Sequence, residues 1–450
     1  MNGGDRELRL EPEPAEAIAS LGRFRGLRTE ARIVFTLGRR LAEWQEESRA
    51  ALGLPLDRPV VLTGHQAGIW HAGILAKWLY ADSIARAAGA ATAAILVEQD
   101  TNDAGEIAYP TLVDGLPRRA SLPTLPSRRG GPTGLARPIR VAPPGAEPAP
   151  GLSPRLASVV AAVNAEASAP NLAAQMAAAN DRLLRERLGL VPPPTIAASR
   201  LVELPFAKAL LADLASRPHG TAAYAAALAS DPRAARPLGP GELPLWRLVP
   251  GEPFARREGV RAGDPPPSPG VRLAPRAFLM TAIARLALGD LFIHGTGGGR
   301  YERVTDAWIH RWLGIRFAPM AVASATLRLP LEGGLAGRVG ATPAGFRRRA
   351  CDPDAAGAGP SEARRGFLDA IAAAPRGSAA RRDAYRALIA QRERRRREIA
   401  AELALLAAEV EGSRDRAAAI EVARSRTWPW PLHDDVTLAG LAAAIRAAVG

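Results

Sequence analysis

The chain has 450 residues, of which 47% are hydrophobic and 5% aromatic, and its formal net charge is +14. This composition excludes a disordered chain and allows two or three domains packed mainly by small aliphatic side chains. The positive charge suggests nucleic acid, but apart from Lys77 and Lys208 it is all arginine, spread along the chain. Nucleic-acid binders usually gather charge on one face, so we do not expect a nucleic-acid partner.

Cysteine content and the N-terminal segment limit the compartment and the kind of site. A single cysteine, Cys351, rules out an intrachain disulfide or a cysteine metal site, and the six histidines lack paired metal spacing. Residues 1–16 are polar and acidic, unlike a signal peptide. No apolar run approaches the ~18 residues of a membrane span. We therefore expect a cytoplasmic protein with no membrane partner and no metal site of its own.

The first elements predict a parallel α/β unit. Residues 17–53 have helical apolar spacing, and Val60-Val61-Leu62 is a short buried strand followed by a glycine turn. Apolar positions from Ile69 to Ala88 predict a helix that stops at Gly89, and a second strand follows at 93–97. The order strand, glycine turn, helix, strand is that of a parallel α/β unit.

The middle of the chain contains fewer strand signals. Residues 117–151 are rich in Pro, Gly and Arg and predict a long loop, and 231–275 is loop-like around three consecutive prolines. The intervening segments 155–190 and 200–230 are alanine-rich and predicted to be helical.

A second α/β stretch begins near residue 275. A helix is predicted for 275–288, a strand for 291–294, a glycine loop for 295–299, a helix for 301–313 and a strand for 322–329. The order repeats that of the first unit.

The tail predicts one long helix over 381–411, with Tyr385, Arg392, Ile399 and Leu406 seven residues apart. We expect it to form an antiparallel hairpin with a helix near 361–373. The overall expectation is an α/β fold: a Rossmann-like parallel sheet core with helical insertions and a C-terminal coiled-coil helix. The expected segments are 1–116, 117–274, 275–360 and 361–450.

The first candidate site is the predicted loop Thr63-Gly64-His65-Gln66, continuing to Gly68 and His71. In open α/β sheets ligands bind beyond the carboxyl ends of the strands. A glycine turn lets backbone N–H groups approach a ligand there, and a helix N-terminus favours anions. The alternative is an ordinary strand-to-helix turn whose glycines serve packing only.

The second candidate is the acidic strand end formed by Glu98, Asp100, Asp103 and Glu106. In a parallel unit these carboxylates would lie beside the first loop. They could bind a substrate amine, hold Mg²⁺ together with phosphates or act as a general base. The alternative is a solvated loop with helix-capping side chains.

The third candidate runs from His294 through the glycine loop to Arg300, Tyr301 and Glu302. Its consecutive glycines are costly in chain entropy, which suggests close approach by a ligand or a neighbouring backbone. Arg300 and Tyr301 could bind a carboxylate or stack on a ring. The alternative is a flexible turn.

Two aromatic segments and the cysteine complete the candidates. The stretch 242–246, which ends in Trp246, could close over a pocket, and the tryptophan-proline run 428–431 is expected to pack the tail onto the body. Cys351 lies in a polar stretch without a nearby histidine and is not expected to be a nucleophile.

The run Val60 to Gly68, followed by a helix carrying Lys77, resembles the bacillithiol-biosynthesis cysteine-adding enzyme family. That family has a TGQQ-type loop after its first strand and an acidic second strand end, here 97–100. The stretch 297–302 looks like its later glycine-rich loop, 324–329 like its following strand, and the long C-terminal helix fits its coiled coil. The first glutamine of the family's loop is His65 here, and the family's histidine between the acids is absent, as in a divergent member.

The resemblance implies a ligase-like reaction that joins an amino-acid carboxylate to an amino-sugar-type amine, with ATP or another nucleotide and possible Mg²⁺. The residues expected to be catalytic are His65, Asp100, Asp103 and His294. Those expected to bind substrate or nucleotide are Thr63, Gly64, Gln66, Gly68, His71, Lys77, Gly295, Gly297, Gly298, Arg300, Tyr301 and Glu302. The expected partners are small molecules and a second copy of the chain, bound through the C-terminal helix. The alternative is a non-catalytic nucleotide- or metabolite-binding dimer.

Overall fold

The computed structural model describes residues 7–31, 34–125, 131–251, 255–332, 346, 350 and 362–450. The chain divides into two compact units. The first unit comprises Met1–Thr111, Arg119–Leu329 and Ser425–Gly450, and the second comprises Leu112–Arg118 and Pro330–Arg424. Cys351 lies outside the described residues.

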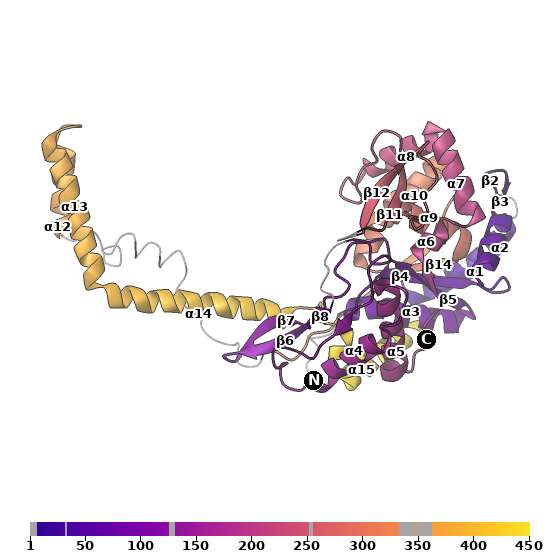
Figure 1. Cartoon of the computed structure of the whole chain (residues 1–450), viewed down its shortest axis with the longest axis horizontal. Helices are drawn as coiled ribbons and strands as arrows, with labels where there is room; N and C mark the ends of the chain where they lie inside the picture. The colour runs from indigo at the N-terminus through magenta and orange to yellow at the C-terminus, as the bar shows by residue number, and fades with distance from the viewer. Residues whose placement is uncertain are drawn as a thin grey trace. The chain divides into compact units, whose positions relative to one another are not determined.

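The first unit is built on a six-stranded, mostly parallel sheet with helices around it (Figure 1). Only β1 is antiparallel to its neighbour, β15; the other neighbouring pairs are parallel, which confirms the predicted parallel α/β arrangement. The strand order is β1 (Glu7–Glu11), β15 (Met320–Thr326), β14 (Leu291–His294), β4 (Val60–Gln66), β5 (Ala91–Val97) and β10 (Thr195–Ala197).

Two strand–helix–strand units start from the neighbouring central strands β4 and β14 and run in opposite directions across the sheet. From β4 the chain passes through α3 (Ala72–Ala88) to β5, and from β14 it passes through α10 (Thr296–Leu313) to β15. Val60 and Leu62 pack in one core with α9 (Ala277–Ile283) and α10. Figure 1 shows α3 on the other side of the sheet. The strand order therefore reverses between β4 and β14.

A buried ion pair joins the starts of these two strands. The Asp290 carboxylate, just before β14, accepts hydrogen bonds from Arg49 Nη2 and from the backbone N–H of Val60, each at 2.8 Å. Arg49 lies on α2 (Leu41–Ala51) and also donates to the Leu288 carbonyl at 2.8 Å. Because Arg49 is fully buried, breaking this pair would leave an uncompensated charge, which typically costs about 3–5 kcal/mol.

The continuous helical stretch expected at 17–53 is wrong. The chain forms α1 (Pro14–Ala31), a short hairpin of β2 (Phe35–Thr36) and β3 (Arg39–Arg40), and then α2. Leu37 and Gly38 take φ angles of 51° and 80° and form the turn of this hairpin, which separates the two helices. Helical apolar spacing on both sides of the turn concealed it.

The loop expected at 231–275 is also wrong, because this segment forms a three-stranded antiparallel sheet. Its strands are β11 (Glu242–Val249), β12 (Arg256–Arg261) and β13 (Arg272–Pro275), in the order β12-β11-β13. The prolines lie mostly in the connections. The segment 117–151 likewise contains strands: β6 (Ala108–Val113) pairs with β7 (Leu116–Ser121), and β8 (Thr124–Leu125) with β9 (Arg140–Val141).

The helical predictions at 155–190 and 200–230 are confirmed. The helices there are α4 (Ser153–Ala165), α5 (Leu172–Leu188), α6 (Ala198–Leu201), α7 (Pro205–Ser216) and α8 (Pro218–Leu228). Helix α9 continues into a π-helical turn at Ala284–Leu288. The tail returns to the first unit as predicted: Trp428 and Trp430 are buried, the backbone N–H of Trp430 donates to the Trp70 carbonyl at 2.7 Å, and α15 (Asp435–Val449) ends the chain.

The second unit contains the predicted helical hairpin. Helix α12 (Glu362–Ala373) packs against α13 (Ala379–Glu398), and Arg381 Nη1 on α13 donates to the Ile371 carbonyl at 2.6 Å. The single long helix expected at 381–411 is wrong: α13 ends at Glu398, Ile399 caps it, and α14 (Ala400–Arg424) follows. No helix among the described residues is long and apolar enough to cross a membrane.

Candidate functional site

A cavity of about 430 Å³ lies in the first unit, at the carboxyl ends of β4 and β14. In open α/β sheets ligands bind at this edge, where the strand order reverses. Elements from distant parts of the chain line it. Its lining residues are Gly64, His65, Gln66, His71, Gly73, Ile74, Lys77, Ile95, Val97, Gln99, Asp100, Trp246, Arg276, Ala277, Met280, Phe292, His294, Gly295, Thr296, Gly297, Gly298, Tyr301, Ser324 and Arg426.

The residues expected to form the first loop belong to β4, so the loop prediction is wrong there. Residues 63–66 pair in register with 94–97 of β5. A Cβ on Gly64 would lie 2.5 Å from the Ile95 carbonyl oxygen, so glycine is required for β5 to come this close. Gly64, His65 and Gln66 line the cavity.

Two residues of that first candidate do not line the cavity. Thr63 is fully buried, and its hydroxyl donates to the Ile293 carbonyl at 3.1 Å, where it links β4 to β14. Gly68 has a φ of 140°, a conformation that favours glycine, and its carbonyl accepts from Asn180 Nδ2 at 2.8 Å. Both are structural in this arrangement.

Lys77 on α3 brings a buried ammonium group to the cavity. Its side chain is 4% exposed, and Nζ donates a hydrogen bond to the Gly64 carbonyl. Among the described residues no carboxylate lies within 4.0 Å of this nitrogen. Burial lowers the pKa of Lys77 to about 7. Near pH 7 Lys77 therefore exchanges between its neutral and charged forms, and an anionic ligand would stabilise the charged form.

His65 and His71 line the cavity beside this lysine, as expected from the sequence. His71 is the N-cap of α3, and its Nδ1 accepts from the Gly73 N–H at 3.0 Å. A neutral His71 must therefore carry its proton on Nε2. Burial, followed by the charges of Arg426 and Lys77, lowers the pKa of His71 to about 4. Burial, with Lys77 and His71, likewise holds the pKa of His65 well below its usual range.

The acidic strand end does not converge as a cluster, and this corrects the second prediction. Asp100 lines the cavity, where its carboxylate accepts from Gln66 Nε2 and from Arg257 Nη1, each at 3.1 Å. Glu98 is buried and accepts from the Ser199 hydroxyl. The remaining two carboxylates, at positions 103 and 106, lie outside the cavity lining.

The third candidate forms a helix start rather than a glycine loop, so that prediction is wrong. Helix α10 begins at Thr296 with Gly295 as its N-cap, which places Gly297 and Gly298 in the first turn. Gly295 and the first turn of α10 line the cavity. A Cβ on Gly298 would lie 2.6 Å from His294 Nδ1, so glycine is required for the imidazole to fit there.

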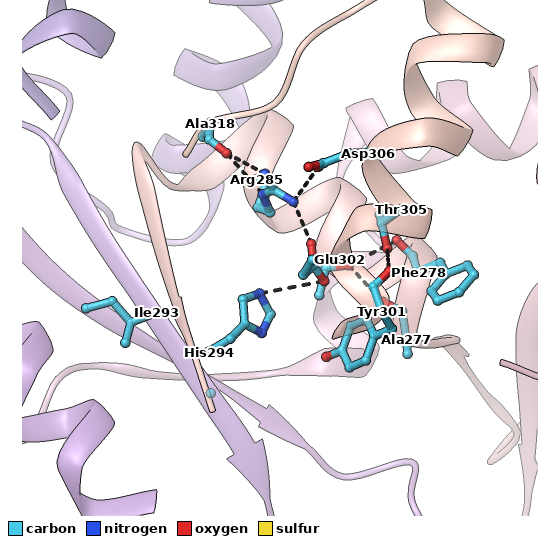
Figure 2. A network of polar contacts seen from close by, with 12 residues as sticks. Ala277, Phe278, Arg285, Ile293, His294, Tyr301, Glu302, Thr305, Asp306 and Ala318 are labelled. Atoms are coloured by element: carbon cyan, nitrogen blue, oxygen red, sulfur yellow. Dashed lines mark hydrogen bonds and ion pairs between the residues drawn. The ribbon is translucent and has the colours of Figure 1, made fainter. Parts of the chain in front are cut away.

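The last three residues of the third candidate, 300–302, lie in different places: one lines the cavity and two do not. Tyr301 lines the cavity, and burial raises the pKa of its hydroxyl. Arg300 does not line it and instead pairs with Asp231 at 2.8 Å on the surface. Glu302 is buried behind His294 and pairs with Arg285 at 2.6 Å (Figure 2).

Several cavity residues were not among the predicted site residues. Arg276 is 7% exposed, its guanidinium lies 3.9 Å from the centre of the Trp246 ring, and its Nη1 is a buried donor with no acceptor among the described residues. Trp246 was expected to close over a pocket, and it lines this one. Ser324 of β15 and Arg426, near the end of the chain, also line it. No local spacing in the sequence could have associated these residues with β4.

The electrostatics of the cavity favour an anion. Lys77, Arg276 and Arg426 line it, and Asp100 is the only carboxylate that the described part of the chain contributes to its lining. The charge of Arg276 is partly balanced by its ion pair with Glu242, which lies outside the lining. The N-termini of α3 and α10 reach it, and neither helix has an acidic residue in its first turn. Unsatisfied N–H groups at a helix N-terminus carry partial positive charge and bind phosphates and carboxylates.

The side chains that line the cavity also determine whether it can hold a metal ion. Within the part of the chain that the structure describes, no group of three or more histidine, cysteine or acidic side chains could hold a metal ion. Because Asp100 is engaged by Gln66 and Arg257, the cavity lining does not fit a protein-held Mg²⁺ site, which needs free oxygen ligands.

A scan of protein-family models finds no match to this chain, and a search of curated proteins finds none either.

Proposed function

We propose that this chain is an amide-forming ligase that binds an anionic, nucleotide-activated substrate in the cavity between β4 and β14. One observation carries the proposal: two helix N-termini and the buried Lys77 converge on this cavity, where no carboxylate lies within 4.0 Å of Lys77 among the described residues. Such an arrangement is stabilised when a phosphate or carboxylate occupies it.

The reaction class comes from the resemblance to the cysteine-adding enzymes of bacillithiol biosynthesis. An amide forms from a carboxylate only after activation, which ATP or another nucleotide supplies. In this proposal the N-terminal turns of α3 and α10 and Lys77 bind the phosphate or the activated acyl group. A Rossmann-like core would place them at the strand ends that such nucleotide sites use.

The second requirement is a base for the attacking amine. The amine nitrogen forms a bond to the acyl carbon, the bond from that carbon to the phosphate oxygen breaks, and the amine loses a proton. Three histidines, His65, His71 and His294, line the cavity, and burial lowers the pKa of each. They are therefore neutral at pH 7, as a proton acceptor must be.

Arg276 and Trp246 also line the proposed site. The unpaired Nη1 of Arg276 can donate to a substrate carboxylate. The Trp246 ring lines the cavity beside it, with the guanidinium groups of Arg257 and Arg276 at 4.4 Å and 3.9 Å from the ring centre. Because the lining does not fit a protein-held magnesium ion, any Mg²⁺ would be carried by the nucleotide phosphates rather than by a carboxylate cluster of the protein.

Ligand binding and turnover test the proposal separately. Thermal unfolding is measured with ATP, ADP, cysteine and amino sugars, singly and in pairs. A ligand present at about 100 times its Kd should stabilise the folded state by ~2.7 kcal/mol. Lys77→Met should abolish stabilisation by nucleotides, whereas Lys208→Met, at the other lysine, which is exposed, should not.

Product formation is followed by mass spectrometry with nucleotide, amino acid and amino sugar together. Amide formation that requires the nucleotide would support the ligase. Stabilisation by a nucleotide without any product would favour the non-catalytic binding protein, and no stabilisation by any anionic ligand would contradict both.

We also propose that the helices of the second unit form a homodimer; a monomeric mass by light scattering would contradict this.

A further inference from the structure

Behind the cavity lies a buried polar network in which two unsatisfied atoms face each other (Figure 2). His294 Nε2 and Glu302 Oε1 are both buried, and neither has a hydrogen-bond partner among the described residues. They lie 3.6 Å apart, slightly beyond hydrogen-bond length. Leaving two such groups unpaired costs free energy, and a small rotation of the imidazole would join them.

The carboxylate of Glu302 is itself held on its other side. Arg285 Nη1 donates to Glu302 Oε2 at 2.6 Å and to Asp306 Oδ1 at 2.7 Å, and Arg285 Nη2 donates to the Ala318 carbonyl at 2.6 Å. Burial raises the pKa of Glu302 to about 7, while the Arg285 guanidinium and, to a smaller extent, the Thr281 hydroxyl act in the opposite direction and favour the ionised carboxylate. Above that pH the carboxylate is ionised, and its remaining oxygen is directed at the imidazole.

The two nitrogens of the His294 ring face different surroundings. Nε2 faces Glu302, while Nδ1 lies on the side of Gly298, in the first turn of α10 that lines the cavity. The ring is fixed between Phe292, stacked at 4.2 Å, and Tyr301, edge-on at 5.9 Å. The imidazole therefore has little freedom to turn over.

We propose that Glu302 is a positioning residue, which holds the proton of His294 on Nε2 and leaves Nδ1 as the acceptor that faces the cavity. An ionised carboxylate only accepts hydrogen bonds, so the nitrogen that faces it must be the donor. A carboxylate behind a histidine fixes its tautomer and stabilises the imidazolium that forms when the ring takes a proton.

This inference rests on the proposed function for its chemical consequence. When the substrate amine attacks, Nδ1 takes its proton, and Glu302 offsets part of the charge on the ring, which burial, Arg285 and Lys77 disfavour. The tautomer can be measured in the protein without any ligand. A failure of the ligase proposal and a failure of the positioning role therefore give different results.

The tautomer is read from the ¹⁵N resonances of the imidazole nitrogens well above pH 7, with His294 assigned by the signals lost in His294→Gln. We expect a pyrrole-type Nε2 and a pyridine-type Nδ1. In Glu302→Gln the remaining side-chain oxygen should stay with Arg285, which turns the new NH₂ group toward Nε2. Nε2 must then become the acceptor, and the proton should move to Nδ1.

Two further variants separate positioning from a general effect on the fold. Asp306→Asn neutralises another carboxylate bound to Arg285 but does not touch His294, so the tautomer should stay as in the wild type. Glu302→Asp keeps an accepting carboxylate and should keep the proton on Nε2. A wild-type His294 whose proton is on Nδ1 would overturn the inference, and so would a tautomer that Glu302→Gln leaves unchanged in the folded protein.

Turnover supplies the second test once a product is known. Because general-base catalysis contributes ~10²–10⁴-fold, Glu302→Gln should lower kcat by a factor within that range. Nucleotide affinity should change by only a few-fold, because Glu302 does not line the cavity. A kcat equal to that of Asp306→Asn would contradict the role of Glu302.

Discussion

Replacement of Lys77 by methionine should make the unliganded protein more stable while it removes anion binding. Lys77 is 4% exposed and has no carboxylate within 4.0 Å among the described residues, so its charge is buried at a cost. Methionine fills a similar space without a charge. A binding residue that destabilises the empty protein is the pattern expected of a functional site.

The magnitude follows from the pKa of Lys77, which is about 7 in the folded protein against an ordinary value of 10.5. A tenfold difference in proton affinity corresponds to ~1.4 kcal/mol, so the buried lysine costs about 4 kcal/mol at pH 7. The substitution also removes the hydrogen bond to the Gly64 carbonyl, which offsets ~1 kcal/mol. The variant should therefore be about 3 kcal/mol more stable at pH 7.

The effect should depend on pH with a defined sign. Between about 7 and 10.5 the unfolded chain carries a proton on Lys77 that the folded protein has lost. Stability rises with pH wherever the unfolded state binds more protons. The wild type should gain stability across this window relative to the variant, and the advantage of methionine should be close to zero at about pH 9.5.

Urea unfolding followed by tryptophan fluorescence measures this difference, because all eight tryptophans lie in the first unit. Lys208→Met is the matched control: it replaces the other lysine, which is exposed, and should leave the midpoint unchanged at both pH values. A Lys77 variant whose stability difference is the same at about pH 7 and about pH 9.5 would refute the account of a desolvated lysine.

Two pairs of substitutions test the elements that frame the cavity, each by thermal unfolding. Gly298→Ala places a Cβ 2.6 Å from His294 Nδ1 and should cost ~1–3 kcal/mol, whereas Gly297→Ala meets nothing within 4 Å and should be neutral or stabilising. His71→Ala removes the side chain that caps the Gly73 N–H and should cost ~1 kcal/mol. His71→Asn keeps an acceptor there and should restore most of that loss; equal losses in the two His71 variants would exclude the capping role.

The central α/β units could be predicted from the sequence because local signals agree there with the tertiary structure. Val60, Val61 and Leu62 form a continuous apolar run, which is what a strand buried on both faces requires. Gly89 ends α3 with a φ of 60°, a conformation that glycine adopts without strain. The strand at 291–294 was predicted with the bounds that the structure has.

Local patterns failed at the edge of the sheet that forms the cavity. Gly64 and the polar residues after it predict a turn, yet they continue β4, because the end of a strand beside a cavity does not need apolar side chains. Glycine is needed at 64 for contact with Ile95 of β5, rather than for a bend. The glycines at 297 and 298 predict a loop and instead lie in a helix start, where position 298 makes room for His294.

The far walls of the cavity could not be predicted at all from spacing. Arg276 and Arg426 reach it from segments far along the chain. Trp246 lies on β11, in a segment whose prolines predicted a loop rather than a sheet. Their placement depends on tertiary packing, about which the periodicity of one segment carries no information. The same holds for the Arg285–Glu302 pair behind His294.

The most direct test of the anion site is an NMR titration of Lys77 labelled with ¹³C at Cε, with exposed Lys208 as the reference signal in the same spectrum. In the free protein the Lys77 signal should titrate near pH 7, because burial lowers its pKa to about 7. Saturating ATP should raise the pKa of Lys77 and leave the reference signal where it was. A Lys77 signal that does not titrate near pH 7 and does not respond to ATP or pyrophosphate would contradict the proposed anion site.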